Sequence, residues 1–250
     1  MPAIFDVRNR VACVTGASSG LGRQAASLLA QAGARVIGIA RRAEELEAWR
    51  TGVQGDTAAV TADLSDRGNL AALAAEIAEP FGAPDILINA AGINTRQHAD
   101  EVTAEGWDVT LNLNLAAPFF LAQAMVPAMK KRGWGRIVNF ASLQSRRAFA
   151  SGISYGASKG GVEQMTRAMA EAWSGHGITA NAVAPGFFRT ELTGPVFANP
   201  DLAKRNADQT CIGRNGEPED LDGPLMFFCS PASDYVTGQT LFVDGGFTAK

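Results

Sequence analysis

The sequence predicts an α/β fold, a doubly wound parallel sheet of about seven strands with helices on both faces. Short apolar runs alternate with segments of helical periodicity, which is the pattern of parallel strands joined by crossover helices. A glycine-rich turn separates the first apolar run from the first helical segment, and polar motifs follow several later runs. The 250 residues contain no linker, charge block or internal repeat, so we expect a single Rossmann-like domain over 1–250.

The strands are predicted from short runs rich in Val, Ile, Leu and Ala. They are expected at 10–14, 35–40, 58–62, 85–89, 136–140, 178–183 and 240–243. Apolar residues at helical spacing predict a helix from Leu21 to Ala32 with Gly33 at its end, and another through Leu70 and Ile77. A long helix is expected over about 104–131, and a further helix carries Tyr155.

The composition excludes several classes of function. The net charge is −3, and no basic stripe favours nucleic acid as a partner. No apolar run stands out as a membrane span, and the first ten residues lack a signal-peptide core, so we expect a cytoplasmic protein. Three scattered cysteines and two histidines do not make a disulfide framework, a metal site or a Ser-His-Asp triad.

The pair Tyr155 and Lys159 predicts acid–base chemistry. Residues four apart lie on one face of a helix, so the Lys159 ammonium can stand beside the Tyr155 phenol. A free tyrosine has a pKa of about 10, and a cation at about 4 Å supplies much of the roughly 4 kcal/mol needed to bring it near 7. Desolvation opposes that shift, so we expect a second positive charge near Tyr155 to assist. Ser142, after the strand at 136–140, is placed to polarise a substrate oxygen.

A dinucleotide site is predicted at the turn Gly16-x-x-x-Gly20-x-Gly22. Glycines allow a close approach to a pyrophosphate at the start of a helix, which Leu21 continues. The hydroxyls of Ser18 and Ser19 add donors.

The end of the second strand predicts the choice of cofactor. A carboxylate there binds the ribose of NAD, whereas an arginine accommodates the extra phosphate of NADP. The strand ends in Ala40 followed by Arg41, which favours NADP(H), with NAD(H) also a candidate. The alternative is a solvated helix start, because Glu44 and Glu45 follow and can pair with arginine.

These motifs, in this order, resemble the short-chain dehydrogenase/reductase family over nearly the whole chain. The resemblance implies Ser142, Tyr155 and Lys159 as catalytic residues, with Asn114, seven residues after Trp107, in a proton relay. It also implies a cofactor site and a homotetramer. The further cofactor residues that it implies are Asp63, Leu64, Asn89, Ala90, Gly92, Tyr155, Lys159, Pro185, Gly186, Phe188 and Thr190.

Two stretches are similar to family members that act on sugar acids, the gluconate 5-dehydrogenase and 2-deoxy-gluconate 3-dehydrogenase types. They are 92–115 and 213 to the C-terminus. The candidate substrate residues are Arg96, which is suited to a carboxylate, together with Gln144 and Arg147. The connection 186–216 is expected to form a substrate lid, and its apolar residues fit a neutral ketone equally well.

The leading hypothesis is therefore an enzyme that transfers a hydride between NADP(H) and a secondary alcohol or ketone, with a sugar acid as the specific candidate. Reduction of a 3-oxoacyl carrier protein or of a neutral ketone is the second hypothesis. A dinucleotide-binding sensor or scaffold without activity is the third, and the presence of acid–base groups argues against it.

Overall fold

The computed structural model describes residues 3–66, 68 and 70–250 of the chain. Its centre is a sheet of seven parallel strands in the order β3-β2-β1-β4-β5-β6-β7, which confirms the predicted fold. The strands are β1 Val11–Thr15, β2 Arg35–Ala40, β3 Thr57–Thr61, β4 Ile86–Asn89, β5 Gly135–Phe140, β6 Ile178–Pro185 and β7 Thr240–Val243. The order reverses between β1 and β4, and ligands of such sheets bind beyond the carboxyl ends of strands at this point.

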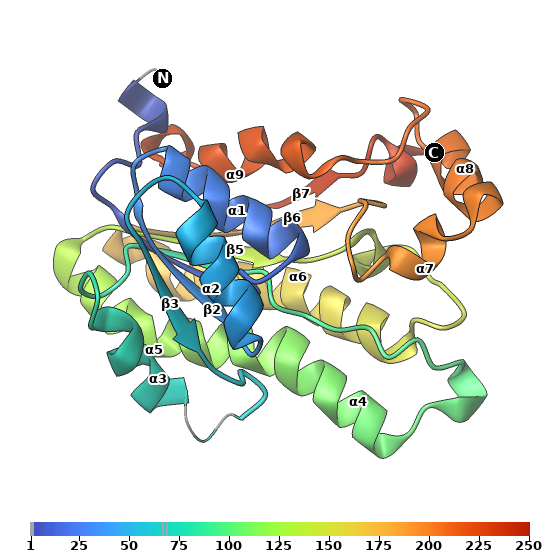
Figure 1. Cartoon of the computed structure of the whole chain (residues 1–250), viewed down its shortest axis with the longest axis horizontal. Helices are drawn as coiled ribbons and strands as arrows, with labels where there is room; N and C mark the ends of the chain where they lie inside the picture. Colours follow the sequence, from blue (N-terminus) through green and yellow to red (C-terminus); the bar gives the residue numbers. More distant parts are fainter. Residues whose placement is uncertain (1–2, 67, 69) are drawn as a thin grey trace.

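Helices cover both faces of the sheet (Figure 1). They are α1 Gly20–Gln31, α2 Ala43–Gly52, α3 Leu70–Ala78, α4 Ala104–Leu111, α5 Ala117–Arg132, α6 Ile153–Trp173, α7 Gly194–Phe197, α8 Pro200–Gln209 and α9 Asp222–Cys229. Shorter 3₁₀ turns are 3–5, 99–101, 143–145, 174–176, 218–221, 231–233 and 247–249.

The core lies in two layers because successive strand residues point to opposite faces. Ala12 and Val14 of β1 pack with α1, α2 and α9 in one layer. Cys13 of the same strand packs in the other layer, with residues of α3, α5 and α6. Both faces of β1 are therefore buried, as expected for a central parallel strand.

The predicted long helix is present and contains an irregularity. Helices α4 and α5 are joined through a π-helical turn at Asn112–Ala116, so the helical path runs from Ala104 to Arg132. By length and composition this helix is apolar enough to cross a membrane, and half of its most apolar 18-residue window is buried in the protein. Core helices pass the same criterion. A π-helical turn often marks a functional site, and this one carries Asn114.

The connection after β6 is partly helical. The segment 186–216 contains α7 and α8, and α8 begins with an Asn199 cap whose Oδ1 accepts hydrogen bonds from two backbone N–H groups. Its residues that border the cavity described below are Gly186–Phe188, Thr190–Thr193 and Val196.

Candidate active site

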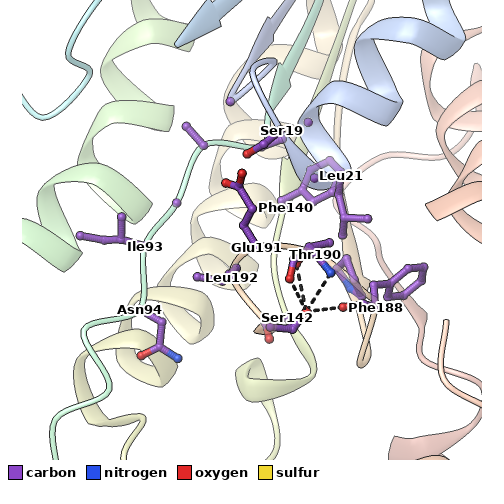
Figure 2. Close-up of a pocket in the computed structure, with 18 of the residues that line it drawn as sticks. Ser19, Leu21, Ile93, Asn94, Phe140, Ser142, Phe188, Thr190, Glu191 and Leu192 are labelled. Atoms are coloured by element: carbon purple, nitrogen blue, oxygen red, sulfur yellow. Dashed lines mark hydrogen bonds between the residues drawn. The ribbon is translucent and has the colours of Figure 1, made fainter. Parts of the chain in front are cut away.

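A cavity of about 580 Å³ lies at the carboxyl ends of β1, β2, β4, β5 and β6. The glycine turn, the segment after β4 and the segment after β6 each contribute residues to its lining. Figure 2 shows Ile93 and Asn94 on the opposite side of the cavity from Leu21 and Phe188. The volume is of the size that binds small molecules and cofactors.

The glycine turn is shaped for close approach of a ligand. Gly16 has φ of +74°, and a Cβ on Gly22 would lie 2.4 Å from the carbonyl oxygen of Gly16. Ser19 is the N-cap of α1, and its side chain makes no capping hydrogen bond. The N–H groups at the start of α1 are thus left without a side-chain cap, which suits a pyrophosphate. On this observation, the residues fit the phosphates of a dinucleotide.

The segment after β4 is fixed by buried polar groups. The Oγ1 of Thr15 accepts hydrogen bonds of 3.0 Å from the backbone N–H groups of Ala90 and Ala91. Asn89 points into the protein, where its Nδ2 donates to the Oδ1 of Asn139 at 2.9 Å, and it does not border the cavity. The Asn89 side chain is therefore turned away from the cavity in which we expected it to bind the cofactor.

Ser142 and Tyr155 lie together at the base of the cavity. Both side chains are 8% exposed, and a hydrogen bond from Ser142 acts on the Tyr155 hydroxyl. The Oγ of Ser142 also accepts from the backbone N–H of Gln144 at 3.1 Å, which fixes its orientation. Burial raises the pKa of Tyr155 above its ordinary value, while Ser142 and the charge of Arg96 oppose the increase.

Lys159 lies one helical turn beyond Tyr155 on α6 and is buried. Its Nζ is 5.6 Å from the centre of the Tyr155 ring and donates a 2.6 Å hydrogen bond to the carbonyl oxygen of Phe140. Burial lowers the pKa of Lys159 to about 8. The two side chains therefore share one side of α6, as their spacing predicts. Lys159 is not among the groups that lower the pKa of Tyr155, which burial keeps raised.

Asn114 lies behind the cavity wall. Its Oδ1 accepts from the backbone N–H of Ile93 and its Nδ2 donates to the carbonyl of the same residue, both at 2.9 Å. A third hydrogen bond, of 3.1 Å, goes to the Oγ of Ser158, one residue before Lys159. Asn114 therefore fixes the segment after β4 against α6.

The arginines after β2 differ in their contacts. Arg41 borders the cavity, and its charge helps to lower the pKa of Asp63 after the larger effects of the Ser65 backbone N–H and hydroxyl. Arg42, which our sequence analysis missed, donates from Nη2 to the Oγ of Ser19 at 2.7 Å. It also forms an ion pair with Glu191 at 3.0 Å. Asp63 itself accepts from Ser65 and does not border the cavity.

The candidate substrate residues separate into two groups. Arg96 and Gln144 border the cavity, whereas Arg147 does not, and its guanidinium lies 5.8 Å from the centre of the Phe247 ring. Arg96 has φ of +53°, an uncommon conformation outside glycine. Its Nη2 donates to the carbonyl oxygen of Leu192 at 2.5 Å.

The remaining predicted residues border the cavity together. They are Ser18, Gly20, Leu21, Leu64, Ala90, Gly92, Pro185, Gly186, Phe188 and Thr190. Our sequence analysis did not select Ile93, Asn94, Glu191 or Leu192, which also border it and carry no local motif. Within residues 3–66, 68 and 70–250, no three His, Cys, Asp or Glu side chains are grouped to hold a metal ion.

Fold and site together define a nicotinamide-nucleotide oxidoreductase, because a dinucleotide-binding sheet carries a buried tyrosine, lysine and serine at its ligand edge. A family model described as enoyl-(acyl carrier protein) reductase matches residues 16–248. The chain belongs to the short-chain dehydrogenase/reductase family and is an NAD(P)-dependent enzyme.

Individual relatives are similar over nearly the whole chain. The 2-dehydro-3-deoxy-D-gluconate 5-dehydrogenase of Dickeya dadantii is 41% identical, with 98% of each chain covered. The galactitol 2-dehydrogenase (L-tagatose-forming) of Cereibacter sphaeroides is 40% identical, with 98% of this chain and 97% of that one covered. A crystal structure of a gluconate 5-dehydrogenase from Burkholderia cenocepacia with NADP and tartrate has a TM-score of 0.92 and 36% identity, covering 99% of this chain and 98% of that one.

Proposed function

We propose that this enzyme interconverts a secondary alcohol and a ketone on a sugar acid, with NADP(H) as its preferred cofactor and NAD(H) as a slower alternative. The observation that carries the proposal is the position of Arg96. Its charge acts on the Tyr155 hydroxyl, and both residues border the same cavity. A guanidinium near the acid–base group favours a substrate with a carboxylate.

The chemistry follows from the side chains at the base of the cavity. When bound, the nicotinamide ring supplies or accepts the hydride. The Ser142 hydroxyl donates a hydrogen bond to the substrate oxygen and orients it beside Tyr155. During reduction the Tyr155 hydroxyl gives its proton to that oxygen, and during oxidation it takes the proton back. The Lys159 ammonium stabilises the resulting tyrosinate, which burial by itself disfavours.

Several features support NADP(H) as the cofactor. The residue at position 40 is alanine, so no carboxylate is present there to accept hydrogen bonds from the ribose hydroxyls of NAD(H). Two arginines, Arg41 and Arg42, border the cavity together with Ser18 and Ser19. The Burkholderia relative was crystallised with NADP. The two arginines provide the positive charge that an additional phosphate requires.

A sugar acid is supported by both the site and the relatives. The guanidinium of Arg96 has one hydrogen-bond partner among the described residues, the carbonyl of Leu192, so further N–H donors remain for a carboxylate. The Dickeya and Burkholderia relatives carry names of sugar-acid dehydrogenases. The galactitol enzyme and the apolar side chains of Phe187 and Leu192 favour a neutral substrate instead.

Initial rates distinguish these substrates. NADPH oxidation, with NADH in parallel, is measured with a keto sugar acid and with the neutral ketose of equal chain length. Arg96→Gln should lower kcat/KM for the acid about 10- to 100-fold and leave the ketose within about 2-fold, since charged hydrogen bonds contribute about 1.5–3 kcal/mol. Arg147→Gln, which lies outside the cavity, is the matched control. Equal losses on both substrates would reject Arg96 as a carboxylate ligand.

The lid, assembly and location complete the proposal. The connection 186–216 is the substrate lid, and the cavity-lining residues Gly186–Phe188, Thr190–Thr193 and Val196 within it support this role. The assembly is a cytoplasmic homotetramer that binds neither nucleic acid nor membrane. Exposed apolar side chains on helices and on the edge strand support self-association, including Phe120, Ile153 and Leu241. Sedimentation equilibrium at several concentrations tests the tetramer, and a monomer at micromolar concentration would refute it.

A further inference from the structure

The Arg42 guanidinium is already paired with an anion of this chain. Its Nη2 and Nη1 donate to the two carboxylate oxygens of Glu191 at 3.0 and 3.3 Å. The same Nη2 donates to the hydroxyls of Ser19 and Ser18 at 2.7 and 3.3 Å. The two-point contact is the geometry in which arginine binds carboxylates and phosphates.

Glu191 reaches this position from the segment after β6, 149 residues further along the chain. Figure 2 shows its carboxylate directed across the cavity toward Ser19. Hydrogen bonds from Arg42, and then from Ser19, lower the pKa of Glu191, so the group is an anion at neutral pH. A guanidinium, a serine hydroxyl and the uncapped start of α1 are also the groups that favour a phosphate monoester.

We propose that Glu191 is a specificity-determining residue for the cofactor, because its carboxylate holds the Arg42 and Ser19 groups that the 2′-phosphate of NADP(H) requires. NADP(H) must displace this carboxylate, whereas NAD(H) has no phosphate to place there. Glu191 therefore weakens NADP(H) binding selectively and moderates the preference that the arginines create. The inference rests on the proposed use of NADP(H).

The rest of the segment is held without Glu191. The Thr193 hydroxyl donates to the carbonyl of Phe188, and the backbone N–H of Thr190 donates to the Oγ1 of Thr193 at 3.0 Å. The carbonyl of Leu192 accepts from Arg96. Replacement of Glu191 by glutamine therefore removes a charge and leaves the backbone of the segment in place.

Binding titrations of the full-length protein without substrate test the proposal. Dissociation constants for NADPH and NADH are measured by nucleotide fluorescence for the wild type, Glu191→Gln, Arg42→Gln and the double variant. Glu191→Gln should tighten NADPH binding about 2- to 5-fold, the upper range for an exposed ion pair, and leave the dissociation constant for NADH unchanged. In the Arg42→Gln background the same change should have a smaller effect on NADPH, because only the Ser19 hydroxyl remains to be released and only the charge repulsion between carboxylate and phosphate is relieved. Glu45→Gln is the control. It also removes a carboxylate near Arg42, but Glu45 lies in α2, directly after Arg42, and approaches the guanidinium only to 3.8 Å.

The outcomes separate this inference from the proposed function. Equal tightening of NADPH and NADH, or a gain for NADPH that is undiminished without Arg42, would overturn the role of Glu191. A wild type that binds NADH more tightly than NADPH would overturn the proposed NADP(H) preference, while the effect of Glu191→Gln on NADPH still decides the role of Glu191. Adenosine 2′-phosphate and adenosine serve as probes that lack the nicotinamide half of the cofactor. Glu191→Gln should tighten binding of adenosine 2′-phosphate and leave binding of adenosine unchanged.

Discussion

Lys159 donates a hydrogen bond of 2.6 Å from its Nζ to the carbonyl oxygen of Phe140. Phe140 ends β5 two residues before Ser142, and Lys159 lies on α6 four residues after Tyr155. The bond thus connects the two elements that carry the acid–base groups. A neutral carbonyl satisfies a donor of the ammonium but supplies no negative charge, so burial still lowers the pKa of Lys159 to about 8.

The stability of the protein should depend on pH through Lys159. Its pKa is 10.5 when unfolded and about 8 when folded, a difference of about 3 kcal/mol. Below pH 8 Lys159 is charged in both the folded and the unfolded protein, so the cost of burying its charge destabilises the folded state in full. Between pH 8 and 10.5 the unfolded state binds more protons, so the Lys159 contribution to the free energy of unfolding rises with pH.

Urea unfolding of the cofactor-free wild type and of Lys159→Met measures this contribution. The free energy of unfolding of the wild type minus that of the variant should increase by up to about 3 kcal/mol between pH 7 and 10. Both proteins carry the same remaining ionisable groups, so the difference isolates the contribution of Lys159. A difference that stays constant with pH would contradict a buried, depressed Lys159.

Tyr155→Phe should abolish the chemical step and preserve cofactor binding. The variant loses the proton donor and keeps the ring, so kcat should fall about 10²- to 10⁴-fold. The Kd for NADPH, followed by fluorescence, should remain within about 2-fold. The chain has one other tyrosine, Tyr235, which is fully exposed, and Tyr235→Phe serves as the matched control. Turnover by the Tyr155 variant within tenfold of the wild type would reject the mechanism.

Gly22→Ala should damage both stability and cofactor binding. The new Cβ would meet the carbonyl oxygen of Gly16 at 2.4 Å, and overpacking of this kind costs about 1–3 kcal/mol. The control is Gly52→Ala at the end of α2, where a Cβ meets nothing within 4 Å and helix propensity favours alanine by up to about 1 kcal/mol. Urea midpoints and NADPH titration should therefore separate the two variants, and a fully stable Gly22 variant would contradict the close packing.

Much of the fold was predictable because its signals are local. Short apolar runs and helical periodicity depend only on neighbouring residues, and the seven predicted strands agree with the observed ones to within about two residues. Helices α7, α8 and α9 were not predicted. Helices α7 and α9 are four and eight residues long, too short for a clear periodicity, and the ten-residue α8 lies in the connection 186–216 that we expected to be a lid.

The sequence by itself determined the sheet, the glycine turn and the Tyr155–Lys159 pair, since a spacing of four on a helix places two side chains on one face. Only the tertiary structure decided which of two adjacent arginines contacts the glycine turn, and that Arg42 meets Glu191 there. It also turned Asn89 toward Asn139 and away from the cavity. These contacts join residues far apart in the chain, and a local sequence pattern does not show which distant residues will meet in space.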